Sequence, residues 1–191
     1  MAVSTASRTL AGVEIPAPGV WEIDPSHSEA GFVARHLLIA KVRGSFERFS
    51  GSILIGDGVD DSSVEVTIEA SSITTKDATR DEHLRSPDFL DVAQYPALRF
   101  RSTSVERTGE RELAVHGELT IRDVTKPVTL AAVYEGVTVD PWGNTRAVFT
   151  ATTEIDREQF GMTWNQALEA GGVLVGKKVA IELSVEAVRA G

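Results

Sequence analysis

The stretch SVEVTIEA, residues 63–70, alternates apolar and polar side chains without a break. Val64, Val66, Ile68 and Ala70 share one face, while acidic and hydroxyl side chains occupy the other. Because side chains in a β-strand point alternately to opposite sides, this pattern predicts a strand with one buried face. Strands of this kind are typical of antiparallel sheets, since parallel sheets are usually buried on both faces.

The same alternation recurs along most of the chain. It is clearest in LAVHGELTI (residues 113–121) and KVAIELSVEA (residues 178–187), and further strands are expected over residues 19–24, 28–36, 42–55, 96–106, 127–136 and 145–155. Turn signals such as GDGVDD, RTGE and DPWGN separate these segments. About eight or nine strands with one apolar face indicate an all-β fold, either a closed antiparallel barrel or a sandwich.

Alternation stops between Thr74 and Asp91, where short helices are expected instead. Thr75 can cap a first helix, and the sequence Ser86-Pro87-Asp88 resembles a second helix start. We therefore expect a short helical segment around residues 75–91 that lies across one end of the sheet structure. Arg80 and Asp81 would fasten it, and its apolar anchors would be Leu84, Phe89 and Leu90.

The composition limits the kinds of molecule that this protein is expected to bind. The chain has 191 residues, a net charge of -9 and no cysteine, so nucleic-acid binding, disulfides and thiolate metal sites are not expected. Since no apolar run approaches the ~18 residues of a membrane span, stable membrane insertion is not expected either. Residues 1–19 lack a signal-peptide core and favour a flexible tail before a domain at 20–191, with a cytoplasmic location.

The polar residues lack the spacing of a catalytic or metal site. His27 and His36 are an odd number of residues apart, so in one strand they would face opposite ways. The sequence contains no HExxH or GxSxG motif, and no phosphate-binding glycine loop opens a helix. We therefore expect no metal, no cofactor, no catalytic residue and no enzymatic activity.

The apolar residues leave two interpretations of the core. The interior of a barrel of about eight strands can be filled by side chains or can hold one small ligand. Phe32 shares its expected face with the small residues Ala30 and Ala34, which favours free space. His36 ends this row, where it could contact a ligand head group or form a hydrogen bond at the barrel rim.

Six blocks of the sequence, in this order, closely resemble the YceI-like family of polyisoprenoid-binding proteins. They are WEIDPSHSEAGFVARH (21–36), VRGSFERFSGSI (42–53), SVEVTIEASSITT (63–75), RDEHLRSPDFLDVAQYPALRFRS (80–102), GELTIRDVTKPVTL (117–130) and DREQFGMTWN (156–165). The resemblance implies an extended, eight-stranded, lipocalin-like barrel. It also implies that the lumen binds an isoprenoid lipid, such as a polyprenyl phosphate or a quinone, for transport, storage or sequestration.

Strand parity, combined with the resemblance, gives a set of expected ligand contacts. They are Phe32, Ala34, His36, Phe46, Phe49, Leu84, Phe89, Leu90, Phe100, Leu119, Phe160, Met162 and Trp164. Two alternatives remain at this point: an enzyme that acts on a small apolar substrate in the same barrel, and a stress-related interaction protein with a packed core. A homodimer also remains open.

Overall fold

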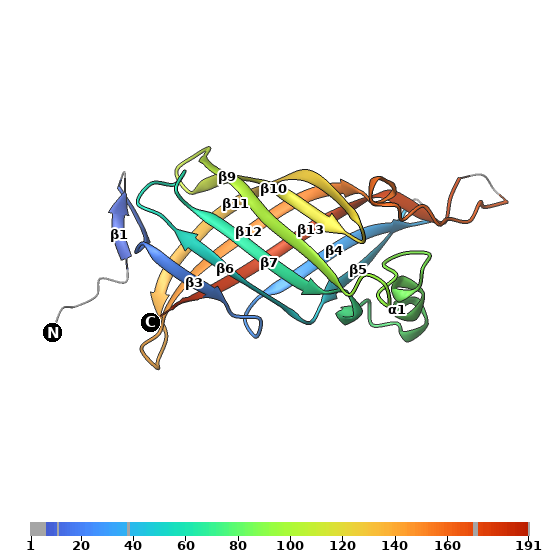
Figure 1. The fold of residues 1–191 in the computed structure, drawn as a ribbon, viewed down its shortest axis with the longest axis horizontal. Helices are drawn as coiled ribbons and strands as arrows, with labels where there is room; N and C mark the ends of the chain where they lie inside the picture. Colours follow the sequence, from blue (N-terminus) through green and yellow to red (C-terminus); the bar gives the residue numbers. More distant parts are fainter. Residues whose placement is uncertain (1–6, 11, 38, 170–171, 191) are drawn as a thin grey trace.

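The computed structural model describes residues 7–10, 12–37, 39–169 and 172–190, and it is an elongated antiparallel β-barrel with one α-helix at one end (Figure 1). The strands are β1 (Ser7–Leu10), β2 (Val13–Pro16), β3 (Gly19–Ile23), β4 (Glu29–His36), β5 (Ala40–Phe46), β6 (Phe49–Ile55), β7 (Ser63–Glu69), β8 (Ile73–Thr74), β9 (Ala97–Arg107), β10 (Glu112–Ile121), β11 (Val124–Val139), β12 (Thr145–Asp156) and β13 (Val175–Arg189). The helices are η1 (Ala70–Ser72), α1 (Ala78–Arg85) and η2 (Arg157–Phe160). The all-β prediction is confirmed.

Eight strands close the barrel. They follow the order β12, β11, β10, β9, β7, β6, β3 and β13, and β13 then pairs with β12 to complete the circle. The long strand β13 pairs with β3 at residues 187–189 and with β4 at residues 175–184. Strands β3 and β4 therefore pair with successive parts of β13 and lie one after the other on the same side of the barrel. Strands β5 and β8 extend the sheet beyond β4 toward α1. The predicted eight-stranded, lipocalin-like barrel is confirmed.

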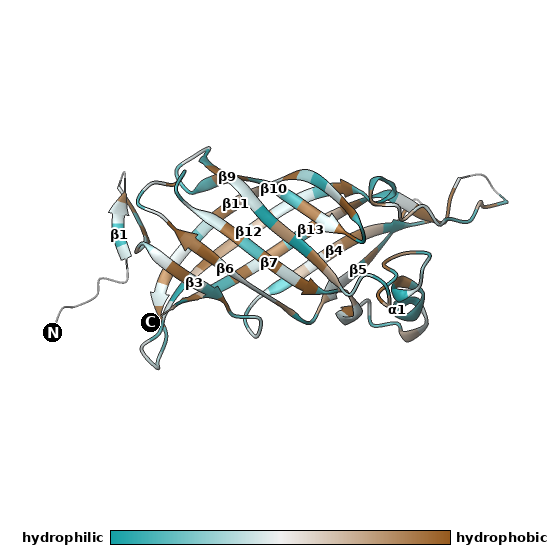
Figure 2. Cartoon of the chain, viewed as in Figure 1, coloured by the Kyte–Doolittle hydropathy of each residue, from teal (hydrophilic) through white to brown (hydrophobic). Residues whose placement is uncertain are grey.

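The alternation in the sequence becomes the inside and outside of this barrel. Figure 2 shows hydrophobic and hydrophilic residues alternating along the strands. Two inward phenylalanines need a glycine beside them on the neighbouring strand. A Cβ on Gly44 would lie 2.3 Å from Phe32 Cζ, and a Cβ on Gly117 would lie 2.5 Å from Phe100 Cζ. Each ring therefore occupies the space that a neighbouring side chain would otherwise fill.

The helical segment differs in detail from the prediction. Helix α1 is capped by Asp77, whose carboxylate accepts a hydrogen bond from the Arg80 amide, so Thr75 is not the cap. The second of the two expected helical turns, at Ser86-Pro87-Asp88, does not become a helix, because residues 86–90 form hydrogen-bonded turns. Ser86 is extended, with ψ at 169°, and its hydroxyl donates to the His83 carbonyl, which ends the helix there.

Thr75 instead accounts for how α1 is attached. Its amide and hydroxyl donate to the Asp81 carboxylate at 2.7 and 2.6 Å, and Arg80 Nε donates to the Thr75 hydroxyl at 2.7 Å. Burial raises the pKa of Asp81, but the hydrogen bonds from Thr75 and Thr74 outweigh burial and lower it overall. Arg85 adds two bonds of 2.8 Å to the carbonyls of Ser71 and Ile73. These bonds hold α1 against the barrel end.

The N-terminal segment is more ordered than a loose tail. Residues 1–6 lie outside the described part of the chain, but β1 and β2 pair as an antiparallel hairpin, the N-terminal hairpin (Ser7–Pro16). Val13 and Ala17 are buried, and the Trp21 indole donates to the Ala17 carbonyl at 3.0 Å. The hairpin stands at the barrel end opposite α1 (Figure 1), and we call these two the hairpin end and the helix end.

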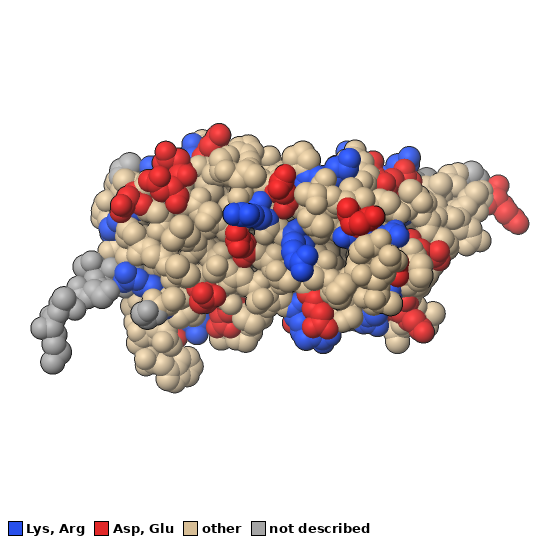
Figure 3. Space-filling view, viewed as in Figure 1, with Lys and Arg blue, Asp and Glu red and all other residues tan. Residues whose placement is uncertain are grey.

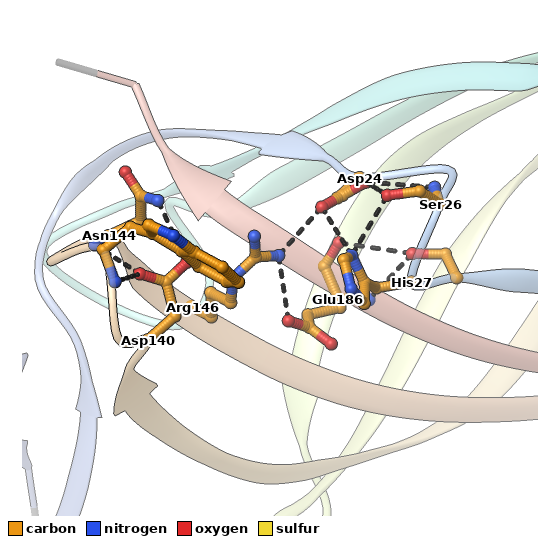
Figure 4. A network of polar contacts seen from close by, with 9 residues as sticks. Asp24, Ser26, His27, Asp140, Asn144, Arg146 and Glu186 are labelled. Atoms are coloured by element: carbon orange, nitrogen blue, oxygen red, sulfur yellow. Dashed lines mark hydrogen bonds and ion pairs between the residues drawn. The ribbon is translucent and has the colours of Figure 1, made fainter.

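A polar network at the hairpin end joins several strands (Figure 4). The Arg146 guanidinium contacts carboxylate oxygens of Asp24 at 2.8 Å and of Asp140 and Glu186 at 2.9 Å. Hydrogen bonds from Arg146, and then from Ser26 and His27, hold the pKa of Asp24 well below its usual range. Hydrogen bonds from Asn144, together with Arg146, lower the pKa of Asp140. The network therefore ties the β3–β4 and β11–β12 turns to strands β12 and β13.

The network predicts a pH-dependent stability. A carboxylate with a depressed pKa stabilises the folded state fully above its unfolded pKa of about 4, and this contribution is lost as the pH falls. We expect Arg146→Met to be less stable than the wild type at pH 7. The difference should shrink progressively below about pH 4. Urea unfolding followed by tryptophan fluorescence between pH 7 and the acid range measures this difference.

The matched control is Arg43→Met, because Arg43 forms an exposed ion pair with Glu182 at 2.8 Å. Exposed pairs contribute little, so this variant should resemble the wild type at each pH. A difference for Arg146→Met that stayed constant on acidification would show that the ionised carboxylates are not its source.

Candidate ligand-binding cavity

The interior of the barrel is not packed solid. It holds a cavity of about 380 Å³ that reaches from Leu84 and Phe89 at the helix end to Leu10 and Val13 at the hairpin end. This volume falls within the usual range of small-molecule sites, roughly 300–1,000 Å³. The alternative of a core filled completely by side chains is therefore not supported.

The wall of the cavity is mainly apolar and is built by inward rows of the strands. On β11 the inward row is Val128, Leu130, Ala132 and Tyr134, and Ala132 lies opposite Ala151 of β12. Two small side chains opposite one another leave room in the middle of the barrel. A dry wall of this kind favours a hydrocarbon ligand, because burial of apolar surface is the main source of binding energy.

Most of the expected contact residues lie in this wall. They are Phe32, Ala34, Phe46, Phe49, Leu84, Phe89, Leu90, Phe100, Leu119 and Met162. Strand parity identified those on the strands, since one face of each strand points inward. Leu84, Phe89 and Leu90 belong to α1 and the turns after it, and they close the helix end. Whether these residues touch a ligand remains a prediction.

Three expected contacts lie outside the cavity wall. His36 ends β4 and is not part of the cavity wall, although its register partner Val175 is. Phe160 is buried behind the wall in η2, and the Trp164 ring packs against Phe89 at 5.5 Å. Strand parity placed His36 on the same face as Phe32 and Ala34, but parity could not show which residues of that row reach the cavity.

The wall also contains residues that the sequence analysis missed. The N-terminal hairpin contributes Leu10, Val13 and Ile15, and the inward row of β11 contributes Tyr134. The alternation of Val13 and Ile15 with polar neighbours was a signal for a strand there. That strand is short and follows a stretch of small and polar residues, so the segment resembled a tail.

A buried cation lies beside the helix end of the cavity. Arg157 is 3% exposed, and its guanidinium donates to the carbonyls of Met162, Trp164, Val175 and Gly176. Its guanidinium carbon lies 5.8 Å from the centre of the Phe89 ring. Burial lowers the pKa of Arg157. Because its donors are engaged by backbone carbonyls, we assign it a structural role.

The described residues contain no group of three or more His, Asp or Glu side chains arranged to hold a metal ion. In the same part of the chain, no helix has the length and hydropathy needed to cross a bilayer. Acidic and basic side chains are interspersed over the face shown in Figure 3. Such a mixed surface differs from the continuous basic stripe that nucleic acid binding requires.

An antiparallel barrel that closes around an apolar cavity defines the lipocalin-like class of ligand-binding barrels. The YceI-like domain model matches residues 21–187, and the chain therefore belongs to the YceI-like family. The resemblance found in the six sequence blocks is confirmed. The family and the fold are of a binding-protein type.

Individual relatives agree with this assignment. A UPF0312 protein of Staphylococcus aureus (strain USA300) is 38% identical over 166 residues, which are 85% of this chain and 94% of that protein. A Campylobacter jejuni YCEI protein structure is 27% identical, covers 82% of this chain and 90% of its own, and has a TM-score of 0.71. The fold is also that of a polyisoprenoid binding domain from Saccharophagus degradans, with 13% identity, a TM-score of 0.69, and coverage of 91% of this chain and 100% of that one.

Proposed function

We propose that this protein binds a long-chain isoprenoid lipid in its cavity and serves to transport, store or sequester it. The observation that carries the proposal is the mainly apolar cavity, whose wall includes residues from both barrel ends. Burial of each CH₂ group contributes about 0.8 kcal/mol, so a chain of several isoprene units needs shape and dryness more than polar contacts. The polyisoprenoid binding named for the Saccharophagus degradans domain supports the same class of ligand.

The alternative of an enzyme in the same barrel has less support. That reading needs a polar cluster in the cavity, with His36 beside an inward acid as the candidate. His36 lies outside the wall, and Arg157 has its donors engaged by backbone carbonyls. Binding without chemical change is therefore the function that we propose.

The test is direct. Mass spectrometry of an organic extract of the purified protein should detect a prenyl lipid, and delipidated protein should take up a fluorescent geranylgeranyl probe saturably. Folding of the delipidated protein is checked by circular dichroism. Folded protein that carries no lipid and takes up no prenyl probe would overturn the proposed function.

A further inference from the structure

The two ends of the cavity differ in their polar groups. At the helix end, Arg157 has its donors occupied by backbone carbonyls. At the hairpin end, the wall includes Arg8, Arg107, Glu110 and Arg111. The barrel therefore presents an apolar end and a polar end to a ligand that enters it.

Tyr134 contributes a buried polar group to the wall at the hairpin end. It lies on the inward row of β11 and is 4% exposed, with the Phe149 ring at 5.5 Å and the Arg111 guanidinium 5.9 Å from its ring centre. Its hydroxyl has no hydrogen-bond partner among the described residues. Burial, and then the nearby Glu14 carboxylate, raise the pKa of Tyr134 to about 12. The hydroxyl is therefore neutral near pH 7 and keeps a proton that it can donate.

Arg8 provides a second unused donor at the same end. Its terminal nitrogen donates to the carbonyls of Gly56 and Asp57 at 2.6 and 2.9 Å, which ties the N-terminal hairpin to the β6–β7 loop. The Arg8 Nε, in contrast, is buried and lacks a partner within the described part of the chain. Buried donors without acceptors are rare in folded proteins. Among the described residues the Arg122 Nε is a third such atom, but Arg122 does not line the cavity, whereas Tyr134 and Arg8 both do.

We propose that the hairpin end of the cavity is the head-group site, where Tyr134 and Arg8 donate hydrogen bonds to an acceptor oxygen of the lipid. The tail then extends along the apolar wall toward α1, and the N-terminal hairpin covers the head. This inference rests on the proposed function. The hairpin precedes residues 21–187, so part of the cavity wall at this end comes from outside the family domain.

The chemical class of the head group follows from the nearby charges. Asp57 pairs with Arg8 at 3.6 Å, and the carboxylates of Glu14 and Glu110 lie at the same end, so the arginines are balanced by acids. The unused groups are donors, which makes an acceptor oxygen the required feature. A prenyl phosphate and a prenyl quinone both supply such an oxygen.

Tyr134→Phe tests the site, because it removes only the hydroxyl. We expect its affinity for geranylgeranyl monophosphate, or for a quinone with the same C20 tail, to fall by about five- to tenfold. Its affinity for the head-free hydrocarbon phytane should stay that of the wild type. Tyr95→Phe is the matched control, since Tyr95 is not part of the cavity wall and packs under Arg122, 5.6 Å from its ring centre.

The three probes separate failure of this inference from failure of the proposed function. A greater loss for the phosphate than for the quinone identifies the head group as a phosphate, and the reverse identifies it as a quinone. Equal affinities of Tyr134→Phe and wild type for every probe would overturn the head-group site while the proposed function stands. If Tyr134→Phe lost affinity for phytane as strongly as for the two oxygen-bearing probes, the head-group site would also be overturned while the proposed function stands. Failure of the wild type to bind any of the three would overturn both.

Discussion

Arg157→Met should lower the free energy of unfolding by about 3 kcal/mol, because buried carbonyls would lose a charged donor. The guanidinium donates at 2.9 Å to the carbonyls of Gly176 and Trp164, and it also bonds those of Met162 and Val175. These bonds join η2 to the start of β13 and fix the loop at the helix end. Urea unfolding measures the loss.

Two further variants show which property of Arg157 matters. Arg157→Lys keeps the charge but lacks the planar fork, so it should recover only part of the lost stability. Arg101→Met removes an arginine whose exposed ion pair with Glu65 spans 3.0 Å, and it should cost less than about 1 kcal/mol. An Arg157→Met protein as stable as Arg101→Met would show that the buried bonds contribute little.

Ala132→Phe should reduce the affinity for a geranylgeranyl probe by more than about tenfold, which corresponds to about 1.4 kcal/mol. Ala132 is buried on the inward row of β11, opposite Ala151, where the wall is made of small side chains. A phenyl ring there would occupy part of the 380 Å³ cavity and obstruct the path of the tail. Because there is free space, the cost to stability should stay below about 2 kcal/mol.

The adjacent residue provides the control. Ala131 is exposed on the outer face of the same strand, so Ala131→Phe adds the same ring outside the barrel. Its affinity for the probe should equal that of the wild type. Fluorescence titration of the two variants side by side measures the contrast. Equal affinities for two well-folded variants would mean that the lipid tail does not pass Ala132.

The sequence identified much of the cavity wall because strand parity determines which side chains face inward. Phe32, Phe100 and Leu119 were found in this way, and the break in alternation located the segment that closes the helix end. Strand parity cannot predict where side chains point outside regular strands. Phe160 and Trp164 follow the end of β12, and their positions depend on how η2 and the following loop fold back.

The N-terminal hairpin was missed for a different reason. Its strands have only four residues each, and small and polar residues precede them, so local propensity favours a tail. The hairpin forms where Arg8 can bond the β6–β7 loop and where Val13 can be buried against the barrel end. These contacts involve residues about 50 positions apart in the chain, and no short window of sequence contains them.

The sequence by itself determined the antiparallel strands, their buried faces and the family, because each of these depends on residue order within one segment. Only the tertiary structure decided that β12 pairs with β13 to close the barrel and that the inward rows leave a cavity. It also decided that the Tyr134 hydroxyl and Arg8 Nε, which have no partner among the described residues, lie at the same end. The physical reason is that closure, free volume and unsatisfied donors depend on which distant side chains meet, and alternation along a strand carries no information about that.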